Sequence, residues 1–453
     1  MSRFESFVSE NAQADISKLI LSTKEWPEHE DPTLRCIDAK DLAVNTIYAR
    51  NRLTRKAPVW ASTPGLVFPT RLSVEQCSST MAADYKARLA ERILEDKKPS
   101  QRRIADLTGG LGVDSLAFSK VAGDVLYNEM DQSLAAAARH NFPILKARNI
   151  TISSIKAGKG SISGIIGTFR PDLIFIDPAR RDASGNKVFL LEECSPDVLT
   201  IIPELFLYSR NILLKLSPMA DIPMVWERLN TAARESMHPI AGKGRCIREI
   251  HVTAYDGECK EVLIWMDREY EGRRTTFCVE DGNPMKFSPG KSCEEFRGVD
   301  STYSKLLFEP GKSFTKAGVY NELCERLSLA KYARFTHLYT IPEVTTDEEM
   351  KAHAERLSKY GKVYSVIETV PLNKASLKEI GQKYPKCEVT ARNIPMTSDE
   401  LRARLKVGSG DDIHIFGVRI ELPSDSGNYL VVCTPLRYGS QNSRLAFWKW
   451  SPW

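Results

Sequence analysis

The chain has 453 residues and a net charge of +5, and 42% of its residues are hydrophobic while 27% are charged. The length predicts two to four domains, and the composition is typical of a soluble globular protein. No run approaches the roughly 18 consecutive apolar residues of a membrane span, and the N-terminal sequence MSRFESFVSENAQAD lacks the apolar core of a signal peptide. We therefore expect a cytoplasmic protein that does not span a membrane.

Ten cysteines and seven histidines are scattered along the chain, without a CxxC pair or another spacing typical of metal ligands. We therefore expect no metal site. Residues 371–453 carry 12 Lys and Arg against 8 Asp and Glu. This mild excess is compatible with a phosphate-rich ligand but does not identify the partner, and the composition leaves the oligomeric state open.

Residues 1–95 are predicted to be mostly helical. From Ser73 to Leu94, the side chains of Met81, Tyr85 and Leu89 recur at helical spacing with charged residues between them. The sequence LysLysProSer at 97–100 interrupts this pattern and predicts a boundary between the helical region and the segment that follows.

Residues 96–270 alternate short apolar strands with amphipathic helices, the pattern of βαβ units around a parallel sheet. The five predicted strands are IADL (104–107), DVLYNE (124–129), ITISSI (150–155), DLIFID (172–177) and NILLKLS (211–217). Two further apolar runs follow, and Asp256-Gly257 between them predicts an antiparallel hairpin. A parallel sheet that ends in such a hairpin is not the usual layout of a dinucleotide-binding dehydrogenase.

Polar residues at 271–274 predict a linker, after which residues 275–370 and 371–453 have the mixed patterns of two small α+β units. The second unit contains the predicted helix SDELRARLK, preceded by a threonine with capping-box spacing to its glutamate. Arg402 and Lys406 are four residues apart, so we expect them on one helix face. There they would either bridge adjacent phosphates or simply face solvent.

The strongest chemical signal is a glycine-rich turn after the first predicted strand, DLTGGLGVD at 106–114. Gly109, Gly110 and Gly112 allow the backbone to approach a ligand closely, and the following helix points its N-terminal amides to the same place. For the segment taken alone, the alternative is a tight turn that binds no ligand.

The second predicted strand ends in Glu129, whose carboxylate can accept hydrogen bonds from both hydroxyls of a ribose. Glu129 lies 20 residues after Gly109, which also fits a dinucleotide fingerprint, but the glycine pattern is GGxG and not GxGxxG. Asp106 stands just before the turn, where a carboxylate would repel a pyrophosphate and attract an ammonium or a sulfonium. These features favour S-adenosylmethionine over a nicotinamide dinucleotide.

The fourth predicted strand ends in Asp177-Pro178, and the ends of parallel strands face the ligand crevice of such sheets. We interpret Asp177 as the acceptor for a target amine or its proton; the alternative is a carboxylate that caps the following turn. Pro178 fixes the backbone just after it. Arg180 and Arg181 either clamp a substrate phosphate or face solvent.

The turn at 106–114, Glu129, Asp177-Pro-Ala-Arg and the closing hairpin together resemble class I methyltransferases, particularly their RNA-modifying branch. The whole chain resembles bacterial class I methyltransferases with a THUMP-like C-terminal domain. Three further segments carry the likeness: EQCSSTMAADYKA (75–87), similar to a helix of trimethylguanosine synthase relatives, FEPGKSFTKAGVYNE (308–322), similar to a ferredoxin-like insert, and LKVGSGDDIHIFGVRI (405–420), similar to the THUMP-like unit.

This resemblance implies an α/β fold, with a Rossmann-like class I methyltransferase sheet (96–270) that ends in an antiparallel hairpin. A helical N-terminal region (1–95) precedes it, and ferredoxin-like (275–370) and THUMP-like (371–453) α+β domains follow. The implied cofactor is S-adenosyl-L-methionine. Because THUMP domains bind RNA, the implied substrate is RNA (tRNA or rRNA). With Asp177 as the acceptor residue, the expected reaction is direct methyl transfer to a base nitrogen.

The resemblance also implies a set of site residues. The expected cofactor contacts are Asp106, Thr108, Gly109, Gly110, Gly112, Asp114, Glu129, Met130 and Ile155. The expected catalytic residues are Asp177 and Pro178, and the expected substrate contacts are Arg180, Arg181, Arg402 and Lys406.

The chain departs from the family pattern beside the proposed acceptor residue. Amino-group methyltransferases of nucleic acids usually carry a proline and an aromatic ring where this chain has Ala179 and Arg180. AspProAlaArg is similar to the enzymes that methylate uridine C5, but those place a cysteine nucleophile after the fifth strand. This chain has Lys215-Leu-Ser-Pro there, which disfavours covalent C5 chemistry.

Two further positions bear on the site. Cys194 follows the arginine pair and could approach the site, although packing is its expected role. Lys156 occupies the region where the family often has an acidic residue near the adenine. The adenine contact is therefore unassigned, with Ile155 as a candidate apolar neighbour.

Two segments elsewhere resemble ligand sites less closely. Pro310-Gly-Lys-Ser looks like the end of a phosphate loop, but Leu306 stands where that loop requires glycine. The aromatic residues at 447–453 either stack on bases or dock on their own domain. Two alternative functions also stay open: a non-catalytic RNA-binding protein on a methyltransferase scaffold, and a methyltransferase for protein or small molecules.

Overall fold

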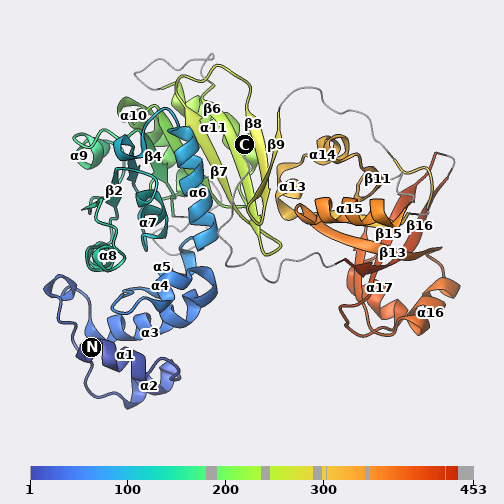
Figure 1. The fold of residues 1–453 in the computed structure, drawn as a ribbon, viewed down its shortest axis with the longest axis horizontal. Coiled ribbons are helices and arrows are strands. Elements are labelled where there is room, and N and C mark those ends of the chain that lie inside the picture. Colours follow the sequence, from blue (N-terminus) through green and yellow to red (C-terminus); the bar gives the residue numbers. More distant parts are fainter. Residues whose placement is uncertain are drawn as a thin grey trace. The chain divides into compact units, whose positions relative to one another are not determined.

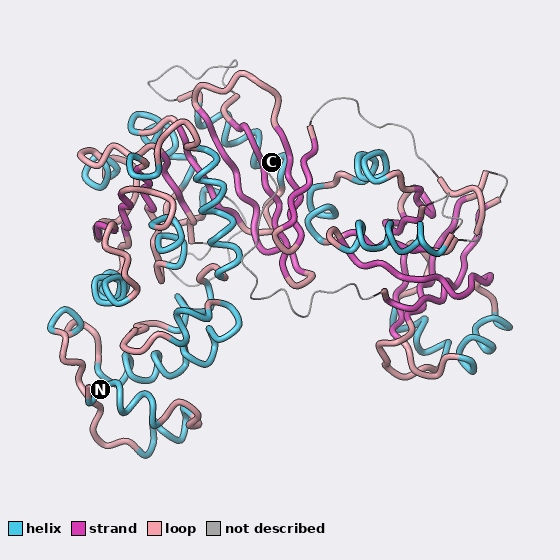
Figure 2. Tube along the Cα trace, viewed as in Figure 1, coloured by secondary structure: helices cyan, strands magenta, loops and turns pink. Residues whose placement is uncertain are grey.

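The computed structural model describes residues 2–179, 191–235, 245–288, 298–302, 304–341, 346–423 and 425–436. The chain forms two compact units, which are described separately below (Figures 1 and 2). The first unit comprises Met1–His251 and Glu261–Arg274, and the second comprises Val252–Lys260 and Thr275–Trp453.

The N-terminal region of the first unit is helical, as the sequence predicts. Its helices are α1 (Arg3–Glu10), α2 (Ile16–Ser22), α3 (Ala39–Lys56), α4 (Pro58–Ser62), α5 (Arg71–Gln76) and α6 (Thr80–Ile93). The stretch Ser73–Leu94, where the sequence shows helical spacing, contains two helices, because α5 ends at Gln76 and the Ser79 side chain accepts a hydrogen bond from the amide of Ala82 to begin α6. The break at 77–79 carries Ser78 to the candidate site described below.

The parallel strands of the first unit are β1 (Arg103–Asp106), β2 (Asp124–Asn128), β3 (Ile150–Ser153), β4 (Leu173–Ile176) and β5 (Asn211–Leu216). They are adjacent in the order β3-β2-β1-β4-β5, so the direction of the crossovers reverses between β1 and β4. The connecting helices are α7 (Val113–Ser119), α8 (Gln132–Ile144), α9 (Ile162–Ile166) and α10 (Val198–Tyr208), and α11 (Ile222–Ala233) follows β5. The predicted parallel sheet is confirmed, and a reversal of this kind opens the ligand crevice of such sheets.

The predicted hairpin is also confirmed. Strands β6 (Ile247–Tyr255) and β7 (Glu258–Asp267) are joined by Asp256 and Gly257, whose φ angles are 52° and 74°. Two positive φ angles in a two-residue turn match the twist of the paired strands. Strand β7 pairs antiparallel with β5, and a second hairpin, β8 (Thr275–Glu280) and β9 (Asn283–Phe287), continues the sheet order beyond β6.

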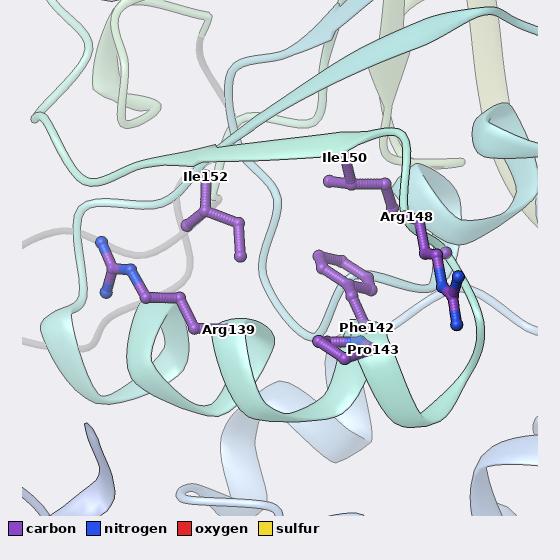
Figure 3. Close-up of a pocket in the computed structure, with 7 residues that line it drawn as sticks. Arg139, Phe142, Pro143, Arg148, Ile150 and Ile152 are labelled. Carbon is purple, nitrogen blue, oxygen red and sulfur yellow. The ribbon is translucent and has the colours of Figure 1, made fainter. Parts of the chain in front are cut away.

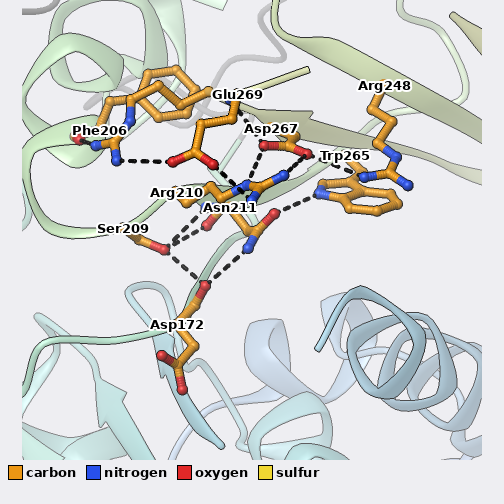
Figure 4. A network of polar contacts seen from close by, with 10 residues as sticks. Asp172, Phe206, Ser209, Arg210, Asn211, Arg248, Trp265, Asp267 and Glu269 are labelled. Atoms are coloured by element: carbon orange, nitrogen blue, oxygen red, sulfur yellow. Dashed lines mark hydrogen bonds and ion pairs between the residues drawn. The ribbon is translucent and has the colours of Figure 1, made fainter. Parts of the chain in front are cut away.

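A buried carboxylate fixes β7 beside β5 (Figure 4). Asp267 accepts hydrogen bonds from Nε and Nη2 of Arg210 at 2.6 and 2.9 Å and lies 3.2 Å from Nη1 of Arg248. The Arg248 guanidinium lies 4.2 Å from the centroid of the Trp265 ring. Because both guanidiniums share one buried carboxylate, this network stabilises the antiparallel addition to the sheet.

The C-terminal part of the second unit is built on one seven-stranded sheet with the order β11-β12-β10-β13-β16-β15-β14. Its strands are β10 (Leu306–Pro310), β11 (Ala330–Ala333), β12 (Thr336–Thr340), β13 (Gly361–Pro371), β14 (Glu388–Arg392), β15 (His414–Glu421) and β16 (Ser426–Pro435). Strand β13 pairs with both β10 and β16. The ferredoxin-like and THUMP-like segments of the sequence therefore share a sheet.

Helices α13 (Lys312–Ala317), α14 (Tyr320–Leu327), α15 (Asp347–Ser358), α16 (Lys374–Lys383) and α17 (Ser398–Leu405) complete the second unit. Helix α15 packs against β10 and β13, and α17 packs against β14 (Figure 1). In the described part of the chain, no helix is long and apolar enough to cross a membrane, and no three His, Cys, Asp or Glu side chains gather as metal ligands.

Candidate active site

The glycine-rich turn lies at the carboxyl end of β1. Gly110 and Gly112 have φ angles of 52° and 91°, in the left-handed region that favours glycine. A Cβ on Gly109 would lie 2.2 Å from the Tyr127 ring, and one on Gly112 would lie 2.7 Å from the Phe142 ring. The Tyr127 hydroxyl donates to the Gly110 carbonyl at 2.6 Å. The turn is therefore held tightly against β2 and α8.

Glu129 stands at the end of β2, directly beside this turn. Its Oε2 accepts a hydrogen bond from the Gly110 amide at 2.8 Å, and its Oε1 accepts one from the Asp131 amide at 2.9 Å. Burial raises the pKa of this carboxyl, although the two amides oppose the rise. Each carboxylate oxygen has a further lone pair, so Glu129 can still accept hydrogen bonds from a ligand.

The two oxygens of Asp106 are engaged within the turn. Oδ1 accepts from the Thr108 amide at 3.1 Å and Oδ2 accepts from the Ser115 hydroxyl at 2.6 Å. The side chain is buried, and burial, together with the nearby Asp114 and Asp177 carboxylates, raises its pKa to about 7 against the Ser115 hydrogen bond. In this structure Asp106 orders the turn, and a direct contact with a cofactor stays a prediction.

Asp177 lies next to Lys215 at the carboxyl ends of β4 and β5. The register pairs Ile176 with Leu214, so the following residues of both strands are neighbours. The Lys215 ammonium pairs with Oδ2 of Asp177. The Asp177 amide donates to the Thr108 hydroxyl at 2.7 Å, which ties Asp177 to the glycine-rich turn.

Lys215 was not among the predicted site residues, although its position could have been inferred from strand alignment. Its side chain is 14% exposed and that of Asp177 is 33% exposed, so the pair reaches solvent at the sheet edge. Burial disfavours the ammonium, but the Asp177, Glu261 and Asp114 carboxylates raise the pKa of Lys215 above its usual value. Lys215 is therefore a cation.

A fully buried lysine, Lys86, holds together the two carboxylates Asp114 and Glu261. Lys86 of α6 has a fully buried side chain whose ammonium lies 2.9 Å from Asp114 and 3.1 Å from Glu261, and it donates to the Ser78 hydroxyl at 2.7 Å. The Ser78 hydroxyl donates to Asp114 at 2.7 Å. Asp114, a predicted cofactor contact, therefore joins the N-terminal helices to α7. Its contact with a cofactor stays a prediction.

The residues present suit S-adenosylmethionine. Met130 follows Glu129 and is 53% exposed, and Ile155 follows β3 and is 39% exposed. The Asn128 side chain bonds to the backbone amide and carbonyl of Ile155 at 3.1 and 2.9 Å, which fixes Ile155 beside β2. Exposed apolar side chains next to a carboxylate with free lone pairs would suit the base and the ribose of an adenosine.

Other predicted residues are either outside the described part of the chain or differ from their expected geometry. Arg180, Arg181 and the aromatic residues at 447–453 are outside the described residues. The shared helix face expected for Arg402 and Lys406 is wrong, because α17 ends at Leu405 and Lys406 has a φ of 58° at the helix C-cap. Arg402 donates to the Cys387 carbonyl at 3.0 Å and to Glu388 at 3.1 Å, and Lys406 is exposed.

The loop at 310–313 binds a carboxylate of the same unit. The Ser313 amide donates to Oε1 of Glu280 at 2.7 Å, and a Cβ on Gly311 would lie 2.0 Å from the Glu280 carboxyl carbon. A side-chain carboxylate therefore takes the position that an anion would need. The expectation that this segment is not a phosphate loop agrees with this geometry.

The loop around Cys194 returns to the carboxyl end of β4. Ala179 and Ser195 exchange backbone hydrogen bonds of 2.8 and 3.0 Å. Cys194 is half-buried. Its expected packing role stays a prediction.

A pocket of about 330 Å³ lies between α8 and β3 (Figure 3). It is lined by an apolar floor flanked by two guanidiniums: Arg139, Phe142, Pro143, Ala147, Arg148, Ile150 and Ile152. None of the predicted cofactor, catalytic or substrate residues lines it, so the pocket is separate from the candidate site.

Two domain families match the C-terminal part of the chain. The ferredoxin-like domain family matches residues 306–347, and the THUMP domain-like family matches residues 361–435. No curated protein matches the chain.

Solved structures resemble the chain more broadly. It is similar to the crystal structure of a "putative methyltransferase from Porphyromonas gingivalis W83", with 26% identity and a TM-score of 0.74 over 96% of this chain and 98% of that chain. The S-adenosylmethionine-dependent methyltransferase from Agrobacterium tumefaciens is 13% identical, with a TM-score of 0.29 over 41% of this chain and 61% of that chain. An rRNA methylase from Streptococcus thermophilus is 8% identical, with a TM-score of 0.28 over 40% and 95%. The full-length likeness is to the first of these.

Proposed function

We propose that this chain, which combines a class I methyltransferase fold with ferredoxin-like and THUMP-like domains, is an S-adenosylmethionine-dependent methyltransferase that methylates RNA at a base nitrogen. The single observation that carries the proposal is the hydrogen bond from the Asp177 amide to the Thr108 hydroxyl. This hydrogen bond places Asp177, which can orient a target nitrogen and accept its proton, beside the glycine-rich turn proposed to bind the cofactor.

In this proposal, the first strands of the sheet hold the cofactor. Glu129 would accept hydrogen bonds from the ribose, the backbone around Gly110 and Gly112 would hold the amino acid portion, and Met130 and Ile155 would contact the adenine. The bound cofactor would supply a methyl group on a sulfonium, ready for transfer to a nucleophile. Asp177 orients the target nitrogen and accepts its proton, and orientation of this kind lowers the barrier by removing the entropic cost of the encounter.

RNA is the proposed substrate because the THUMP domain-like match covers residues 361–435. THUMP domains bind RNA, so the second unit would position the substrate while the first performs the chemistry. Lys406 is the more direct probe of the two cations proposed to contact phosphate, since reversing Arg402 would also break its bonds to Cys387 and Glu388. Lys406→Glu should weaken RNA binding and reduce the log–log salt slope by about one unit. An unchanged slope would exclude Lys406 as a phosphate contact.

The function is tested by incubating the full chain with cofactor labelled in the methyl group and total RNA. Label should enter nuclease-sensitive material with the wild-type protein and not with Asp177→Ala, which should still bind S-adenosylhomocysteine. Lys120→Met is a matched surface control, because the Lys120 side chain is 64% exposed at the end of α7. Label in protein or small molecules alone would overturn the RNA substrate, and cofactor binding without any transfer would favour a non-catalytic RNA-binding protein.

A further inference from the structure

Lys215 places a cation beside Asp177, at the carboxyl ends of β4 and β5. A site that methylates an amine does not require this cation. Its ammonium has three donors, and among the described residues Asp177 is the one hydrogen-bond acceptor that the structure pairs with it. The other charged or titratable groups near enough to interact with it electrostatically are Glu261, Asp114, Lys56 and Cys77. Lys215 therefore combines a fixed positive charge with donor capacity for a ligand.

The Asp177–Lys215 ion pair suits one of two kinds of target nitrogen, an exocyclic amine or a ring N–H beside a carbonyl, better than the other. An exocyclic amine attacks as a neutral group, so a carboxylate alone stabilises the positive charge that develops on it. A ring N–H beside a carbonyl, a lactam, has its lone pair delocalised into that carbonyl and becomes a good nucleophile only when it loses its proton. The negative charge then gathers on the carbonyl oxygen, where a fixed cation stabilises it.

We propose, on the basis of the methyltransferase function proposed above, that the acceptor is a lactam nitrogen such as N1 of guanine or N3 of uracil. Asp177 takes the ring proton, and Lys215 donates a hydrogen bond to the neighbouring carbonyl oxygen. The adjacent register positions of the two residues match the adjacency of N–H and C=O on such a ring. Ala179, which stands where amine-methylating enzymes usually carry a second proline, is consistent with a different acceptor.

The step balances in atoms and charge. The N–H bond breaks and its proton passes to Asp177, while the nitrogen forms a bond to the methyl carbon as the carbon–sulfur bond breaks and sulfur keeps the electron pair. The products are the neutral N-methyl lactam, S-adenosylhomocysteine and a protonated Asp177. Lys215 remains an ammonium throughout, so its role is electrostatic.

The first test identifies the methylated nucleoside by digesting labelled RNA and resolving the products by mass spectrometry. The proposal predicts N1-methylguanosine or N3-methyluridine. Methyl groups on an exocyclic amine, as in N6-methyladenosine, N4-methylcytidine or N2-methylguanosine, would overturn it and leave the RNA methyltransferase function intact. Absence of label in RNA with the wild-type protein would instead remove the function on which the proposal rests.

The second test separates electrostatics from packing at Lys215. Lys215→Met should lower kcat by about 100-fold, the typical cost of removing one donor to a developing oxyanion, with KM for RNA nearly unchanged. Its rate should rise with pH through a range in which the wild-type rate is flat, because alkali then supplies the deprotonation that the cation assisted. Lys215→Arg should recover part of the rate and restore the flat profile.

Controls keep this test interpretable if a variant folds poorly. Both Lys215 variants should bind S-adenosylhomocysteine with wild-type affinity by calorimetry, and Lys120→Met should match the wild type in every assay. Equal loss of activity in Lys215→Met and Lys215→Arg, with no change in the pH profile, would show a structural role and contradict the proposal.

Discussion

Replacing Lys86 by Met should destabilise the first unit, and the loss should depend on pH. Lys86 is fully buried between Asp114, at 2.9 Å, and Glu261, at 3.1 Å, so the replacement leaves two buried carboxylates without their cation. Removing one member of a buried ion pair costs about 3–5 kcal/mol. For a unit of this size, about 2 °C of melting temperature corresponds to each kcal/mol, so the first transition should fall by about 6–10 °C at pH 8.

The sign of the pH effect follows from Glu261. Burial raises the pKa of Glu261, and the Lys86 and Lys215 ammoniums oppose this rise. A carboxyl whose folded-state pKa is raised favours the folded state below its unfolded pKa, and this contribution is lost as the pH rises through the folded pKa. Without Lys86 the pKa should rise further, so acidification to about pH 5.5 should protonate the carboxyl and shrink the deficit.

Differential scanning calorimetry of the wild type, Lys86→Met and Lys86→Met/Glu261→Gln at both pH values measures the loss of stability and its dependence on pH. The double variant should recover part of the stability at pH 8, because it removes one of the orphaned charges. A deficit below about 1 kcal/mol, or an equal deficit at both pH values, would refute the assignment of Lys86 as the cation that balances this cluster.

Three other perturbations probe the site and the sheet. Glu129→Gln should weaken S-adenosylhomocysteine binding by about 10- to 100-fold in calorimetry, because it removes a charge-assisted hydrogen-bond acceptor, and a variant of unchanged affinity would exclude the contact. Since burial raises the pKa of Glu129, the affinity of the wild type should also fall with decreasing pH. Gly112→Ala should lower the melting temperature through about 1–3 kcal/mol of strain, because φ is 91° and the added Cβ would lie 2.7 Å from the Phe142 ring. Gly164→Ala, whose Cβ would have no atom within 4 Å, should leave the melting temperature unchanged, and equal effects of the two variants would refute the argument. Asp267→Asn should cost about 3 kcal/mol by breaking the Arg210 and Arg248 pairs without changing cofactor affinity, and weakened cofactor binding would show that this network is not purely structural.

The parallel strands and the hairpin were predictable because their signals are local. Apolar runs alternate with helical periodicity, and Asp256-Gly257 supplies two positive φ angles in the order that a tight hairpin needs. The break between α5 and α6 was missed because helical periodicity continues across it, whereas the Ser79 cap acts through one hydrogen bond. Lys406 was placed on a helix for the same reason, since periodicity does not reveal a left-handed C-cap.

The candidate site was only partly predictable. The glycine-rich turn, Glu129 and Asp177 follow from strand ends, and the structure places them at the carboxyl ends of β1, β2 and β4. The partners of Asp177 and Asp114 could not be found by local reading, because Lys215 lies 38 residues and Lys86 lies 28 residues away along the chain. Aligning the register of β4 with β5 would have brought Lys215 to Asp177, whereas the contact between Lys86 and Glu261 depends on how α6 packs.

The most direct test of the central claim is a calorimetric titration of the full chain with S-adenosylmethionine, S-adenosylhomocysteine and NAD. The proposed site predicts saturable one-to-one binding of the first two, with affinity that depends on Glu129, and no binding of NAD. Each ligand that binds should also stabilise the fold, by about 2.7 kcal/mol at 100 times its dissociation constant. Binding of NAD, with no response to S-adenosylmethionine or S-adenosylhomocysteine, would contradict the methyltransferase assignment and favour a dehydrogenase.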